Sequence, residues 1–122
     1  MEIFKNIFVS LVGVFHVGFM ILEMFLWRSK LGLKIFRINR EFADSSASLA
    51  ANQGLYNGFL AAGIFWGLLM RDPVVSRSVL TFFLTCVTIA GLFGGLTVSK
   101  RILYIQALPA VSALGFLWLN TQ

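Results

Sequence analysis

Long apolar runs separated by short polar segments dominate the pattern of this chain. Four of the runs are long enough to cross about 30 Å of hydrocarbon as helices. They cover residues 4–27, 49–70, 74–98 and 101–119. Only a few residues separate the last three runs, so these neighbouring helices must run antiparallel. The pattern predicts an all-α membrane protein, a single transmembrane domain over residues 1–122 built as an up-down antiparallel four-helix bundle.

The longer first loop carries a second pattern. Apolar residues recur in it at spacings of four, three and four, namely Leu31, Ile35, Ile38 and Phe42. The basic side chains fall mainly on the other side. This arrangement predicts a short amphipathic helix at the membrane surface over residues 31–43. The residues that follow, Asp44, Ser45 and Ser46, are N-cap candidates for the second span.

Composition supports the membrane class and narrows the partners. The chain is 58% hydrophobic and 12% charged, whereas soluble domains carry about 25% charged residues. The formal net charge is +5, but the basic residues flank the apolar runs. We therefore expect them to meet membrane lipid headgroups rather than nucleic acid. Cys86 is the only cysteine, which excludes an intrachain disulfide.

Lysine and arginine are divided unevenly between the two sides of the predicted bundle. Seven lie in the first and third loops: Arg28, Lys30, Lys34, Arg37, Arg40, Lys100 and Arg101. Three lie on the other side: Lys5, Arg71 and Arg77. The positive-inside rule then predicts a multi-pass protein of the cell membrane, with the first and third loops cytoplasmic and both termini outside.

Two ionisable residues interrupt the first apolar run. Glu23 and His16 are seven residues apart, which places them on one helix face and about 10 Å apart along the axis. A charged side chain in hydrocarbon costs about 2.5 kcal/mol or more, so such a group is a functional-site candidate. We therefore predict Glu23 and His16 as the acid/base residues of a site within the membrane.

Depth matching adds polar residues from other spans. In antiparallel helices, Asn52, Gln53 and Asn57 of the second run and Gln106 of the fourth fall near the level of Glu23. Tyr56 lies within reach of this level. Polar groups in a membrane face the bundle interior and satisfy one another. These five residues are the predicted substrate-binding residues, although each amide can equally hold helices together.

Small residues and one proline predict how the helices approach. Gly54 and Gly58 are four residues apart, as are Gly91 and Gly95, and such ridges let helix backbones pack closely. Pro109 cannot donate a hydrogen bond to the carbonyl of Ile105, so a kink is expected close to Gln106.

Four stretches resemble one known family. They are His16 with Leu22–Trp27, Asn52–Phe59, Ala90–Gly94 and Gln106–Ala110. The chain is similar, over nearly its whole length, to the small bacterial and fungal integral membrane proteins called domain of unknown function 1304. The resemblance implies a compact four-helix membrane protein, and it implies no particular activity.

The favoured function is binding, with or without acid/base transformation, of a small hydrophobic or lipid-like molecule at the Glu23 level. No cofactor is predicted. No metal site is predicted either, because one histidine and one glutamate supply two ligands and a catalytic zinc ordinarily has three from the protein.

Two alternatives stay open. A proton-coupled exporter working as a homodimer is one, because small multidrug transporters also have about four spans and a lone glutamate in the first. The uneven division of lysine and arginine and the longer first loop depart from that pattern. A structural or accessory membrane subunit is the other, and it requires no chemistry at Glu23.

Overall fold

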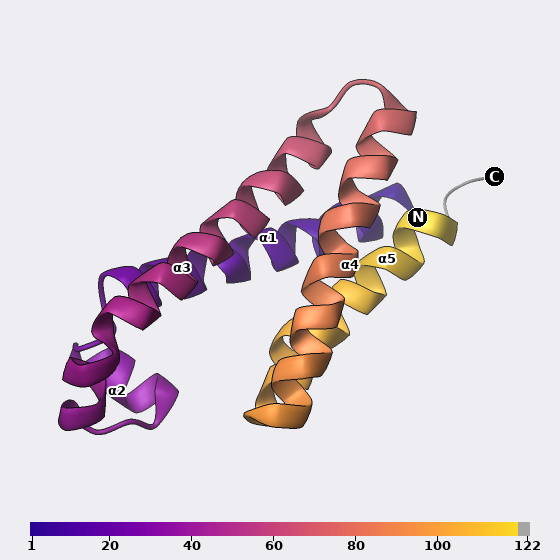
Figure 1. Ribbon diagram of the computed structural model, residues 1–122. Helices are drawn as coiled ribbons and strands as arrows, with labels where there is room; N and C mark the ends of the chain where they lie inside the picture. The colour runs from indigo at the N-terminus through magenta and orange to yellow at the C-terminus, as the bar shows by residue number, and fades with distance from the viewer. Residues whose placement is uncertain (120–122) are drawn as a thin grey trace. The chain divides into compact units, whose positions relative to one another are not determined.

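The computed structural model describes residues 1–119, which form helices joined by short turns (Figure 1). The helices in chain order are α1 (Glu2–Met24), α2 (Lys30–Phe36), α3 (Arg40–Leu69), α4 (Pro73–Thr97), the π-helix η1 (Leu103–Ala107) and α5 (Leu108–Leu119). No strand occurs within residues 1–119, so the predicted all-α class is confirmed.

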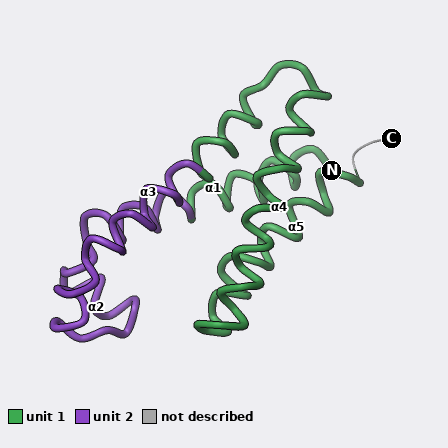
Figure 2. Tube along the Cα trace, viewed as in Figure 1, with its two compact units in different colours: residues 1–15, 60–122 green, residues 16–59 purple. Residues whose placement is uncertain are grey.

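Internal contacts divide the chain into two compact units (Figure 2). Unit 1 comprises residues 1–15 and 60–122, and unit 2 comprises residues 16–59. The helices α1 and α3 therefore contribute residues to both units. The single domain over residues 1–122 stays a prediction.

Unit 1 holds the main hydrophobic core. Its fully or nearly buried side chains come from α1, α3, α4 and α5: Val9, Val12, Ile64, Leu80, Leu84, Val87, Ala110, Ala113 and Leu117. The helix α4 packs closely on the η1 backbone at Gly91, where an added Cβ would lie 2.6 Å from the backbone nitrogen of Ala107. The predicted small-residue contact at Gly91 is therefore present.

Local chemistry explains how α4 begins and where the last apolar stretch departs from a regular α-helix. The side chain of Asp72 accepts hydrogen bonds from the backbone nitrogens of Val74 and Val75, and Pro73 occupies the first turn. This is the expected way to begin a helix. Further along, the backbone N–H of Leu108 donates to the carbonyl of Leu103, five residues earlier. A π-helix that contains Gln106 therefore precedes Pro109, and the kink itself stays a prediction.

Unit 2 corrects the prediction for the first loop. The helix α2 ends at Phe36 because Arg37 adopts the left-handed conformation, with φ 56° and ψ 45°. A short helix is present as predicted, but it covers Lys30–Phe36 rather than residues 31–43, and α3 begins at Arg40. Its place at a membrane surface stays a prediction. The N-cap is also not among Asp44, Ser45 and Ser46, since the Asn39 side chain accepts the backbone N–H of Phe42 at 2.8 Å.

Two helices are long and apolar enough to cross a membrane, namely α1 and α4. The helix α3 is long enough, but Asn52, Gln53 and Asn57 lower its hydropathy. The apolar stretch Leu103–Leu119 is shorter than the other two. The coarse expectation of membrane-crossing helices is thus supported for two of the four predicted spans.

Candidate functional site

The centre of the candidate site is a side-chain pair that joins α1 to α3 within unit 2. Asn57 Nδ2 donates a hydrogen bond to Glu23 Oε2 at 3.1 Å, across 34 positions of sequence. Asn57 is buried, with 7% of its surface exposed, and Glu23 is half-buried. The depth matching that placed Asn57 at the level of Glu23 therefore agrees with the structure.

Glycines on α3 make this close approach possible. An added Cβ at Gly54 would lie 2.8 Å from Met24 Cγ, 3.0 Å from Glu23 Cβ and 3.1 Å from the carbonyl oxygen of Met20. At Gly58 it would meet only Met20, at 2.7 Å from Sδ. We call this contact the α1–α3 seam, formed by Met20, Glu23 and Met24 against Gly54, Asn57 and Gly58.

His16 lies in α1, two turns before Glu23, and is buried with 1% of its surface exposed. Its ring packs edge-on against Phe19, with centroids 5.5 Å apart. Because α1 is continuous from Glu2 to Met24, the axial separation of His16 and Glu23 is about 10 Å. The two groups are therefore too far apart for a direct hydrogen bond.

Two predicted binding residues of α3, Asn52 and Tyr56, lie away from the seam, whereas Gln53 is four residues before Asn57 and its role stays a prediction. Asn52, Gln53 and Tyr56 are all exposed, and Tyr56 packs against Phe59 with ring centroids 6.0 Å apart. Asn52 and Tyr56 are each two residues from Gly54, which turns them about 160° away around the helix. The structure does not bring Asn52 and Tyr56 to Glu23, and their role in binding stays a prediction.

Gln106 belongs to the other unit. It is half-buried within η1 and forms part of unit 1, whereas Glu23 belongs to unit 2. Its predicted meeting with Glu23 therefore stays a prediction.

The structure adds Met24, a site residue that sequence reasoning did not single out. The Met24 side chain packs against Gly54, beside Glu23. The signal was available, because Met24 follows Met20 by four residues and so lies on the same face of α1. Methionine is flexible and adapts its shape to what it contacts, so Met20 and Met24 form a deformable wall next to Glu23.

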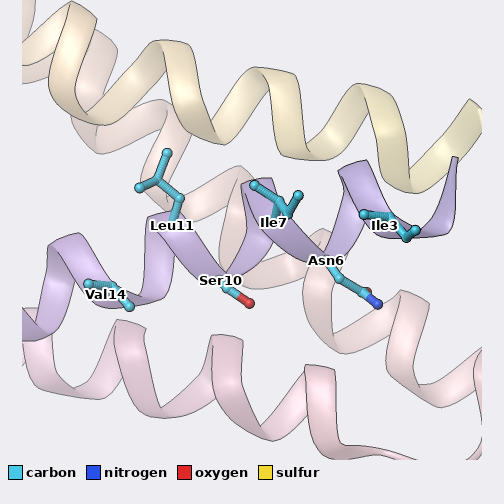
Figure 3. Close-up of a pocket in the computed structure, with 6 residues that line it drawn as sticks. All are labelled: Ile3, Asn6, Ile7, Ser10, Leu11 and Val14. Carbon is cyan, nitrogen blue, oxygen red and sulfur yellow. The ribbon is translucent and has the colours of Figure 1, made fainter.

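A shallow groove of about 580 Å³ runs along α1 within unit 1 (Figure 3). It is lined by Ile3, Asn6, Ile7, Ser10, Leu11 and Val14. Asn6 and Ser10 are the polar positions, one helical turn apart. The groove was not predicted from the sequence, and none of its lining residues belongs to the α1–α3 seam.

Comparison with known proteins gives a family match and one weakly similar relative. The family model described as "Protein of unknown function (DUF1304)" matches residues 10–118. The chain is also 28% identical over 116 residues to "Uncharacterized protein YpaA" of Lactococcus lactis subsp. lactis (strain IL1403), covering 93% of this chain and 96% of that protein. No solved structure shows a significant match. The resemblance expected from the sequence stretches is thus confirmed.

Proposed function

The chain belongs to the DUF1304 family of proteins of unknown function, and from its own residues we propose an integral membrane protein that binds a small hydrophobic or lipid-like molecule. The proposed binding site is the Glu23–Asn57 pair in the α1–α3 seam. Glu23 would hold the polar head of the ligand, and the apolar body would lie along the neighbouring helix surfaces.

The exposure of the apolar helices supports the membrane part of this proposal. Only 22% of the most apolar stretch of α1 and 28% of that of α4 are buried. A core helix of a soluble protein would be mostly buried, and large exposed apolar surfaces are unfavourable in water. We propose a four-helix transmembrane bundle in which α3 and Leu103–Leu119 supply the other two spans, with the first and third loops in the cytoplasm.

The hydrogen bond between Asn57 and Glu23 is the observation that carries the ligand part. Within residues 1–119, the structure gives the Glu23 carboxyl group this one hydrogen bond, on Oε2. Its other oxygen, Oε1, is able to accept a donor such as a hydroxyl or an amine. Asn57 fixes the orientation of the carboxyl group, because a buried amide has few alternative partners.

The position of His16 decides whether chemistry accompanies binding. His16 is buried about 10 Å from Glu23 along α1. A ligand that spans this distance would contact both groups, and each is a residue type that transfers protons. Acid/base transformation is the extended form of the proposal. It requires the ligand, or a water held by the ligand, to reach from Glu23 to His16.

Native mass spectrometry of gently extracted protein tests the proposal. Wild type is compared with Glu23→Gln at the site and with Glu2→Gln as the control. Glu2 is exposed on the same helix and paired with Lys5 at 2.9 Å. We expect a bound small-molecule mass in wild type and Glu2→Gln, and its loss in Glu23→Gln. Equal retention in all three proteins would contradict the proposal.

Two further outcomes identify the alternatives. In the first, wild type and Glu23→Gln both carry no bound molecule at any pH and otherwise behave alike. That result indicates an amide–carboxyl clamp in a structural or accessory subunit. Substrate movement across a vesicle membrane that depends on a proton gradient and on Glu23 indicates the exporter. Either result would replace the binding function proposed for the pair.

A further inference from the structure

Five basic residues lie close together in sequence between the end of α1 and the start of α3. We call them the basic surface: Arg28, Lys30, Lys34, Arg37 and Arg40. We propose that this surface binds the headgroups of anionic phospholipids. The proposal goes beyond the site at Glu23, because it names a second partner and a different set of residues, and all five belong to unit 2.

The cations are available for a partner. All five are exposed, and the neighbouring acids are only Glu41 and Asp44. Asp44 Oδ1 lies 3.9 Å from Arg28 Nη1, and both side chains are more than half exposed. Such an exposed pair contributes little and leaves the guanidinium free to exchange partners. The segment therefore carries an excess of positive charge.

Local contacts hold these cations on an ordered segment. Arg40 Nη1 donates a hydrogen bond to the carbonyl oxygen of Arg28 at 2.8 Å, which ties the two ends of the segment together. Lys30 and Lys34 are four residues apart in α2 and so project from one side of it. The start of α2 is fixed by the Ser29 side chain, whose Oγ accepts a hydrogen bond from the backbone N–H of Gly32 at 3.1 Å.

Arg37 is the most informative member of the basic surface. It is the only non-glycine residue with positive φ within residues 1–119, at the C-cap of α2. Glycine or asparagine ordinarily fills such a position, because a longer side chain costs conformational energy there. An arginine at this place has a worse fit to the backbone than glycine, and a role for its guanidinium group would account for its presence.

Apolar side chains beside the cations favour a lipid surface over a nucleic acid or a soluble acidic protein. Phe25, Leu31 and Phe42 are 72%, 51% and 53% exposed, and each lies within three residues in sequence of one of the cations. Cations next to exposed aromatic and aliphatic groups match the boundary between phosphate headgroups and acyl chains. Trp27, whose indole N–H donates to Ser46 Oγ at 3.0 Å, has the amphipathic character typical of this boundary.

The test measures how the full-length protein in mild detergent binds phosphatidylglycerol and phosphatidylcholine, using native mass spectrometry. We expect tighter binding of phosphatidylglycerol, and no competition by inorganic phosphate at the same concentration. Arg37→Gly should weaken phosphatidylglycerol binding roughly fivefold, as expected for loss of one cation near the surface. The same substitution relieves the left-handed backbone, so its melting temperature should be unchanged or raised.

Arg71→Gln is the matched control, because Arg71 is exposed, carries the same charge and lies in unit 1. It should leave phosphatidylglycerol binding unchanged. Equal affinity for the two lipids would overturn the proposal, and so would equal losses in Arg37→Gly and Arg71→Gln. Competition by inorganic phosphate would also overturn it, since it would indicate a site for free phosphate. Neither substitution touches Glu23 or Asn57, so these results do not depend on the outcome for the proposed ligand site.

Discussion

The α1–α3 seam has no room for a methyl group at Gly54, so an alanine there should destabilise the protein. The Cβ of Gly54→Ala would meet the Met24 side chain at 2.8 Å and the Met20 carbonyl oxygen at 3.1 Å. The methionine side chain can rotate away, but the carbonyl oxygen moves only if α1 moves. Overpacking costs about 1–3 kcal/mol. Alanine recovers about 1 kcal/mol of helix propensity. We therefore expect the free energy of unfolding to fall by up to about 2 kcal/mol.

Two glycines of unit 2 serve as controls for Gly54→Ala. Gly18 has no atom within 4 Å of an added Cβ, so Gly18→Ala should raise the free energy of unfolding by about 0.5–1 kcal/mol. Gly58 would meet only the flexible end of Met20, so Gly58→Ala should lie between the other two. The free energies are measured by reversible denaturation in mixed detergent micelles.

The order of the three alanine variants decides whether the seam exists as described. If Gly54→Ala were as stable as Gly18→Ala, the helices would not approach closely at Gly54. The geometric basis for the hydrogen bond between Asn57 and Glu23 would then be lost. A second readout is the ligand mass retained by each protein. It should decrease in Gly54→Ala and stay unchanged in Gly18→Ala, since only the first substitution pushes Glu23 away from Asn57.

Two further predictions concern unit 1. Asp72→Ala removes the N-cap of α4 and should lower the free energy of unfolding by about 1 kcal/mol, whereas Asp72→Asn keeps a capping side chain and should lower it much less; thermal unfolding of both variants checks this. Gly91→Ala would place a Cβ 2.6 Å from the backbone of Ala107 and should be more destabilising than Gly54→Ala. Gly115→Ala, where an added Cβ meets nothing within 4 Å, is its control; equal stability of the two would contradict the close packing of α4 on η1.

Hydrophobic patterning predicted the helices well wherever a turn signal bounded the run. The third run was expected at residues 74–98, and α4 spans Pro73–Thr97 because Asp72 and Pro73 start a helix unambiguously. The start of α3 was missed, since residues 40–48 continue the helical pattern of the first loop without a strong breaker. The break falls at Arg37, whose left-handed conformation is one that arginine does not favour, so residue preference gives no sign of it. The π-helix before Pro109 was likewise not predicted, because only the missing N–H of the proline was considered.

The sequence predicted which residues of α3 lie at the level of Glu23, but not which of them face it. Matching distances from the helix ends placed Asn57 near Glu23, and the structure joins them at 3.1 Å. The same matching included Asn52 and Tyr56, which are exposed on the other side of α3. Depth alone does not separate these cases, because residues two apart in a helix point about 160° away from each other. Including the helical angle relative to Gly54 would have removed Asn52 and Tyr56 from the seam.

The proposed function requires the Glu23–Asn57 pair to bind the polar head of a hydrophobic molecule. The most direct measurement is an experimental structure of the protein kept throughout with lipids of its own membrane. We expect elongated non-protein density beside α1 and α3, with a polar end within hydrogen-bond distance of Glu23 Oε1 and Asn57 still bonded to Oε2. Protein side chains packed over Oε1, with no room for a ligand, would contradict the claim and leave the pair as a clamp between helices.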